Sequence, residues 1–596
     1  MMVNRNWGRR PRQRIRTIRY AKATGCLAVL GIGLGIGLAF GLTPAPAHAS
    51  HLAASDLTAS DLPAAVNNGA DWRVVKTRWS ATDEAGYSAF VQRIGRADCV
   101  SLADCLASDA NPYRDPEERT FYGDCADMVY TLRAYYAWKN GLPFSYQSAM
   151  RAKDGSGDTR YSSSGNRIVR RTDAVGAAPI NGPSYVAAIR GIVSTAMFRT
   201  DPAGGEAKGG GRFFDDFYPV NVTRKALRPG SVAYDIYGHV GLVYDITEDG
   251  RVLIVASHPD NSVTRTSYGH NFLRADPALG AGLKAWRPIY LEGSTKKSDG
   301  TYMGGRIRAL PNDQLKDYSL TQYIGTHPDP YGDWRKGEFM VGGRTVNYYD
   351  FIRLSLASPD FAYNPVDELR QGLDDLCRAV HDRRVAVRRA IVAGVHKKPH
   401  PAKLPPNIYG TYGAWENYST PSRDARLKVA FIELRRAIET YVRQLRAGLP
   451  TVRYEGDDLA GDLWSAYAAE EKACTVTYRR SDNSRVRLNI THVADRLFDL
   501  SFDPYHCPEL RWGGRGVELE SCTDGPVKRR WYDAQRFLRN QARRTYDVPM
   551  DFTLEQLKPP TIAPPAQGGL GVENPADADL RGYLLSLQQP AGTTVP

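Results

Sequence analysis

The sequence lacks any basic helix or stripe of Lys and Arg residues with interleaved aromatic residues, the usual footprint of a nucleic-acid-binding protein. The formal net charge of +13 does not contradict this, because eight basic residues and no acidic ones lie in residues 1–49. Without that segment the formal charge falls from +13 by eight to +5. The composition therefore gives no support for a nucleic-acid partner.

Cysteine is scarce, with eight residues in a chain of 596. Seven of them follow the N-terminal segment, so pairing in an oxidising compartment leaves one over. Closeness in sequence favours the pairs Cys99–Cys105 and Cys507–Cys522, and then Cys377–Cys474. Spacing alone does not fix these pairs, since six cysteines allow 15 connectivities. Cys125 is left as an intermolecular linker or a reactive thiol.

Histidines at the spacing of metal ligands are also missing. Pro399 interrupts the pair His396 and His400, and His506 has no partner at ligand spacing. The sequence therefore implies neither a metal nor another cofactor.

The N-terminal segment has the three parts of an export signal. Eight basic residues precede an apolar, Gly-rich run from Cys26 to Leu42, and Ala47-His48-Ala49 forms a small-x-small cleavage site. We expect residues 1–49 to be a signal peptide and the protein to be periplasmic or secreted. The alternative is an uncleaved membrane anchor, because the apolar run is near the lower limit for a membrane span; only in that case is the membrane a partner.

The residues around Cys125 predict a helix with a thiol at its N-terminus. Gly123-Asp124 is a turn followed by a capping residue, and an apolar stripe then recurs at helical spacing to about Asn140, where Gly141 and Pro143 end it. Unpaired N–H groups at a helix N-terminus favour a thiolate over a thiol. The sequence therefore predicts a nucleophilic cysteine.

A β-rich block from Gly230 to about Tyr290 supplies two histidines. Strands at Gly238–Asp245 and Val252–Ser257 are joined by a turn, so His239 and His258 come out at the same edge of the sheet. A thiolate needs an imidazole to exchange its proton and a polar group to orient that imidazole. His258 fits the orienting role, and Asp260 or Asn261 is the alternative.

Together these motifs resemble the NlpC/P60-type papain-like cysteine peptidases of bacterial cell walls. The resemblance covers roughly residues 105–292 and implies that Cys125 is the nucleophile, His239 the general base and later acid, and His258 the polar orienter. It also implies an upstream tyrosine at the oxyanion site, for which Tyr113 is the candidate. The same helix start, followed by Asn140-Gly141-Leu142-Pro143, equally resembles bacterial transglutaminase-like proteins.

We therefore expect an exported cysteine hydrolase that cleaves peptide or amide bonds, in the peptidoglycan stem peptide or in a protein substrate, through a thioacyl intermediate. The first alternative is acyl transfer to an amine. The second is a non-catalytic envelope-binding protein on the same fold.

The expected fold class is α+β, with a papain-like catalytic domain (a helix packed on an antiparallel sheet) followed by a mainly helical domain. Long helices are predicted from Pro365 and over Pro421–Ala447. The expected boundaries are a signal peptide at 1–49, a flexible lead-in at 50–70, the papain-like domain at 71–292, a loop-rich connector at 293–360, the helical domain at 361–557, and a disordered tail rich in Pro, Ala and Gly at 558–596.

Overall fold

A computed structural model describes residues 62–115, 119–204, 213–418, 420–544, 548–559, 561–563 and 569–589. The predicted signal peptide and most of the predicted lead-in lie outside these residues. The described residues form one compact unit.

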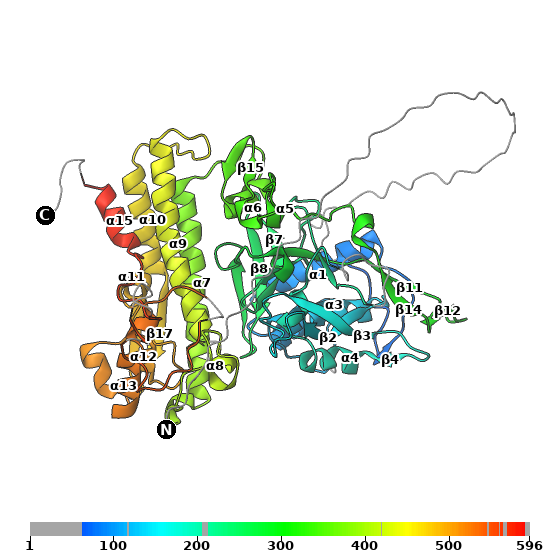
Figure 1. Ribbon diagram of the computed structural model, residues 1–596, viewed down its shortest axis with the longest axis horizontal. Helices are drawn as coiled ribbons and strands as arrows, with labels where there is room; N and C mark the ends of the chain where they lie inside the picture. The colour runs from blue at the N-terminus through cyan, green and yellow to red at the C-terminus, as the bar shows by residue number, and fades with distance from the viewer. Residues whose placement is uncertain are drawn as a thin grey trace, which may run out of the picture. The chain divides into compact units, whose positions relative to one another are not determined.

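The centre of the described chain is a six-stranded sheet in which every neighbouring pair of strands is antiparallel. In spatial order its strands are β5 (Phe217–Pro219), β10 (Gly282–Trp286), β6 (Val232–Asp235), β7 (His239–Ile246), β8 (Val252–Ser257) and β9 (Val263–Ser267). Helices and antiparallel sheets together give the α+β class that the sequence predicts (Figure 1).

One face of this sheet carries helix α3 (Cys125–Lys139) and helix α1 (Ala81–Arg96). All 15 residues of α3 are buried, because the sheet, α1, α4 (Gly182–Ala188) and β2 (Ser145–Ala152) pack around it. β2 pairs with β3 (Asn166–Asp173). Gly141, with φ +61°, follows its C-cap, and a hydrogen bond of 2.9 Å from the Leu142 N–H to the Ala137 carbonyl closes the last turn. The predicted helix from Cys125 to about Asn140 is thus confirmed.

The other face of the sheet has its own apolar cluster. Val243 of β7 and Ile254 of β8 pack there with Phe272 and with Phe351 of helix α6 (Tyr348–Leu356). Val240 and Leu242 of β7 belong instead to the cluster under α3. Successive side chains of β7 therefore alternate between the two faces, as the pleat of a strand requires.

The C-terminal half is built on two long helices, α7 (Pro365–Val392) and α9 (Thr420–Arg446). They lie alongside α10 (Leu459–Ala473), as Figure 1 shows, and share one apolar core. Both long helices were expected from the sequence and are confirmed; Asn364 caps α7, whose first residue is Pro365. The hairpin of β17 (Thr475–Arg479) and β18 (Arg485–Asn489) follows α10.

Residues 293–360, expected as a loop-rich connector, hold more regular structure than predicted. Besides α6 they contain β12 (Thr295–Lys296), β13 (Tyr302–Met303), β14 (Arg306–Ala309), α5 (Thr321–Ile324), β15 (Phe339–Val341) and β16 (Arg344–Val346). β14 pairs with β11 (Ile289–Glu292), so the segment is tied to the strand before it. These strands are only two to four residues long, too short for an alternating pattern to be visible in the sequence.

The prediction of a disordered tail is wrong for helix α15 (Leu580–Leu587). Asp579 caps this helix, and Leu580 and Leu584 are buried in the core shared by α7, α9 and α10. The two leucines are four positions apart and so lie on one face of the helix, which gives the segment a hydrophobic anchor that its overall composition does not suggest.

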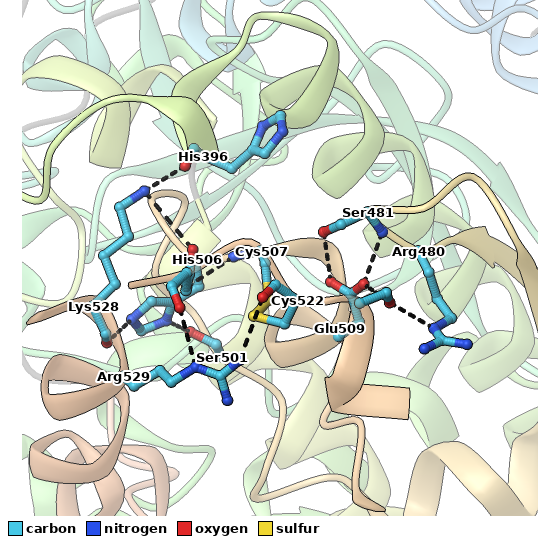
Figure 2. Close-up of a disulfide and its surroundings, with 12 residues drawn as sticks. His396, Arg480, Ser481, Ser501, His506, Cys507, Glu509, Cys522, Lys528 and Arg529 are labelled. Carbon is cyan, nitrogen blue, oxygen red and sulfur yellow. Dashed lines mark hydrogen bonds and ion pairs between the residues drawn. A yellow bond between two sulfur atoms is a disulfide. The ribbon is translucent and has the colours of Figure 1, made fainter. Parts of the chain in front are cut away.

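Three disulfides join Cys99 to Cys105, Cys377 to Cys474, and Cys507 to Cys522, which confirms the predicted pairing. Figure 2 shows the third bridge, where Arg529 donates to the Cys522 carbonyl (3.3 Å), next to the buried carboxylate of Glu509. Among the helices that the structure describes, none combines the length and apolarity needed to span a bilayer.

Candidate functional site

Cys125 opens α3, and local hydrogen bonds fix its position. The carboxylate of Asp124 accepts from the N–H groups of Ala126 (3.0 Å) and Asp127 (3.1 Å), while Asp127 accepts from the N–H of Asp124 (3.0 Å). These reciprocal bonds form a capping box. The hydroxyl of Ser257, at the end of β8, donates to the Gly123 carbonyl (2.6 Å) and ties the helix start to the sheet.

The thiol of Cys125 is free, but it is only 7% exposed. Its sulfur donates to the Gly238 carbonyl at 3.9 Å. Burial raises the pKa of the Cys125 thiol well above its ordinary value, and the nearby Asp124 carboxylate raises it further. The expected stabilisation of a thiolate by the helix N-terminus is therefore outweighed, because desolvation disfavours the charged sulfur more strongly.

The structure brings His239 and His258 together. Their rings are nearly parallel, with centroids 5.2 Å apart and planes inclined by 14°. His258 Nε2 makes a hydrogen bond of 2.8 Å with the Thr264 hydroxyl. The two imidazoles are therefore stacked, and His258 is held by Thr264 rather than by a hydrogen bond to His239.

The imidazole of His239 does not meet the thiol. Val240 lies in the apolar cluster that contains Cys125, whereas the His239 ring packs against Phe272 of the opposite cluster, with centroids 6.2 Å apart. Because alternate residues of a strand point to opposite faces, His239 and Cys125 are separated by the sheet. The backbone of Gly238, just before β7, reaches the sulfur, but the His239 side chain that was expected to take its proton does not.

The structure places Tyr113, the predicted oxyanion residue, away from Cys125. Its ring packs against Tyr136, with centroids 5.8 Å apart, and its carbonyl accepts from the Tyr135 hydroxyl (2.9 Å). Those two residues lie in the last turns of α3, about 15 Å along the helix from Cys125. Tyr113 is 5% exposed and belongs to the aromatic core at the far end of the helix.

The histidines instead line a cavity of about 580 Å³ between the sheet, α7 and α9. His239, His258 and Thr264 lie on the sheet side, and Arg423 and Arg426 lie on α9. One feature of the sequence indicates this site, although it was not used to predict it. Arg423 precedes Leu427 by four residues, so the apolar periodicity of α9 places a charged residue on its buried face.

Burial and nearby arginines hold both histidines neutral. Desolvation lowers the pKa of His239 well below 6.5, and the charges of Arg426, Arg544 and Arg423 lower it further. The pKa of His258 is lowered in the same way, by burial first and Arg423 second. Burial, together with repulsion from Arg544, also lowers the pKa of Arg426 to about 10.

These shifts predict a loss of stability in mild acid. In the folded state both imidazoles stay neutral, whereas in the unfolded chain they take up protons near pH 6.5. The stability is therefore fully present above about pH 6.5 and declines as the pH falls below it, by up to about 1.4 kcal/mol per pH unit for each histidine. Urea unfolding at pH 7.5, 6.5 and 5.5 measures this slope.

The double variant His239→Gln/His258→Gln is expected to show a shallower slope than the wild type. His506, whose pKa burial lowers to about 4, contributes equally in both proteins. The exposed His327, replaced by glutamine, is the control and leaves the slope unchanged. Parallel slopes for wild type and double variant contradict the assignment.

Among the described residues, two groups have the spacing of metal ligands: Cys377, His381 and Cys474, and Cys507, Glu509 and Cys522. Both cysteine pairs are disulfides and so offer no thiolate to an ion. Comparisons with protein-family models, with curated proteins and with solved structures give no significant match.

Proposed function

We propose that this protein is an exported, non-catalytic binding protein of the cell envelope, and that its ligand occupies the cavity between the sheet, α7 and α9. One observation carries the proposal: His239 and His258 turn into this cavity beside Arg423 and Arg426, on the face of the sheet opposite the Cys125 thiol. Large cavities with a few convergent polar groups are the usual form of small-molecule sites.

The packing of α3 on an antiparallel sheet supports a papain-like arrangement for this half of the chain. Three disulfides support folding in an oxidising compartment, hence a periplasmic or secreted location. A fold by itself does not determine an activity, so the choice between binding and catalysis rests on the residues of the site.

An inert thiol tests this proposal. Iodoacetamide at pH 7 is expected to leave Cys125 unlabelled in the folded protein and to label it after unfolding in urea, because a buried thiol of raised pKa holds almost no thiolate. Mass spectrometry of the tryptic peptides gives the extent of labelling. Cys125→Ala is expected to retain the fold and ligand binding. Rapid stoichiometric labelling of the folded protein contradicts the proposal.

A second candidate is the exported cysteine hydrolase acting on peptidoglycan stem peptides or proteins. It is favoured by the free thiol at 3.9 Å from the Gly238 carbonyl, one residue before His239. Catalysis requires an imidazole to reach the sulfur and take its proton. Release of fragments from purified peptidoglycan by the wild type but not by Cys125→Ala selects hydrolysis, and incorporation of an amine selects acyl transfer.

A further inference from the structure

The charges that line the cavity are unevenly balanced. Most of its acidic residues have partners: Asp350 accepts from the Tyr363 hydroxyl (2.9 Å), Glu368 pairs with Arg353 (2.6 Å), Asp375 pairs with Arg251, and Glu433 pairs with Arg436 (3.0 Å). Burial raises the pKa of Asp382 to about 7, so much of it is uncharged at neutral pH. Three of these acidic residues are therefore neutralised by arginines, and burial also raises the pKa of Asp350.

Arg426 is different. Among the described residues that line the cavity, it is a cation with neither an ion pair nor a hydrogen bond. Asp235, whose charge acts on Arg426, pairs with Arg544 (2.8 Å), and Asp260 pairs with Arg423 (3.0 Å). A guanidinium in a low-dielectric site without a counter-ion costs free energy that a bound anion recovers.

Arg423 adds to the positive field. Its side chain is 8% exposed, and only Nη2 is occupied, by Asp260 and by the Ser262 hydroxyl (2.9 Å). Nε and Nη1 are buried without hydrogen-bond partners. Buried donors without acceptors are rare in native proteins, so these N–H groups of Arg423 are available to an acceptor in the cavity.

The surroundings limit the kind of ligand. His239 and His258 are neutral, so one ring nitrogen of each is a potential donor, and Ala430 and Leu427 give the adjacent wall an apolar surface. His270 and Tyr349, with ring centroids 4.0 Å apart, lie further along the cavity. This lining suits an anionic head attached to a less polar body.

We propose that the cavity binds a molecule carrying a phosphate or carboxylate group, with the oxyanion held by Arg426 and supported by Arg423 and the two histidines. This inference rests on the proposed binding function and names its ligand class. Guanidinium groups recognise both oxyanions through paired N–H donors. The oxyanion can therefore belong to a phosphate ester or to a carboxylate, and the experiment has to distinguish these two classes of ligand.

Calorimetric titration of the mature chain at pH 7.5 with inorganic phosphate and with malonate, at constant ionic strength, tests the proposal. The wild type is expected to bind at least one of these anions with a stoichiometry of one. Arg426→Met is expected to weaken that binding about 10- to 100-fold, because it removes the charge-assisted hydrogen bonds and keeps the length of the side chain. Arg446→Met, an exposed position on the same helix, is the matched control.

Binding of phosphate alone assigns phosphate esters, and binding of malonate alone assigns carboxylates. Equal affinity in the wild type and in Arg426→Met, or no binding of either anion, overturns the inference. Arg426 makes no ion pair, so its variant is expected to fold, whereas Arg423→Met breaks the pair with Asp260 and is used only after its unfolding transition is checked. Labelling of Cys125 in the same samples distinguishes a wrong ligand class from a wrong binding function. If the thiol is unreactive and neither anion binds, only the ligand class is refuted. If the thiol is reactive, the binding function itself is refuted.

Discussion

Replacing Arg383 by methionine is expected to lower the free energy of unfolding by about 3–5 kcal/mol. Arg383 of α7 binds Asp424 of α9 through two hydrogen bonds of 2.8 and 3.0 Å, and both side chains are almost completely buried. Nη2 also donates to the carbonyls of Ser501 (3.2 Å) and Arg511 (2.8 Å). The loss is large because the variant leaves the buried Asp424 carboxylate and the Arg511 carbonyl without a donor, whereas the Ser501 carbonyl still accepts from Arg511 Nε (2.9 Å). Urea unfolding monitored by circular dichroism measures it.

Two further variants separate the ion pair from side-chain packing. Arg383→Met/Asp424→Leu removes both charges and is expected to recover much of the lost stability, since no buried charge is left unpaired. Arg370→Met removes an exposed partner of Asp367 and is expected to cost less than about 1 kcal/mol. A single variant at Arg383 as stable as the one at Arg370 contradicts the importance of the buried pair.

Loss of the disulfide between Cys377 and Cys474 is expected to cost about 4.7 kcal/mol in the chain-entropy relation, because the bridge closes a loop of 97 residues. It links α7 to the end of α10, so the loop contains most of the helical core. The double variant Cys377→Ser/Cys474→Ser is compared with the wild type by urea unfolding without reductant.

The matched control is Cys99→Ser/Cys105→Ser, which opens a loop of six residues and is expected to cost about 2.2 kcal/mol by the same relation. A larger loss for this short loop than for the long one shows that local packing, not chain entropy, sets the contribution of these bridges.

Much of the helical structure could be predicted because its signals are local. Asp124 before Cys125, Gly141 after the last turn, and Asn364 before Pro365 mark helix ends through contacts within a few residues. The neighbourhood of His239 and His258 was predictable for a similar reason, since a hairpin returns the chain to its starting edge.

That Cys125 and His239 lie on opposite faces of the sheet could not be predicted from such local signals. The face that each residue of β7 takes depends on two apolar clusters built from distant segments, one around α3 and the other around Phe272 and α6. A sequence pattern gives the alternation but not which face meets the helix. The position of Tyr113 was not predictable either, because contacts with Tyr135 and Tyr136 near the end of α3 determine it rather than a local pattern.

The alternation of β7 also bears on how such a framework evolves. An insertion or deletion of one residue ahead of the strand reverses the side that every one of its side chains takes, which would carry the imidazole of His239 through the sheet toward the sulfur of Cys125. The same shift would move Val240 and Leu242 out of the cluster under α3, so the apolar residues of β7 fix the side on which His239 lies.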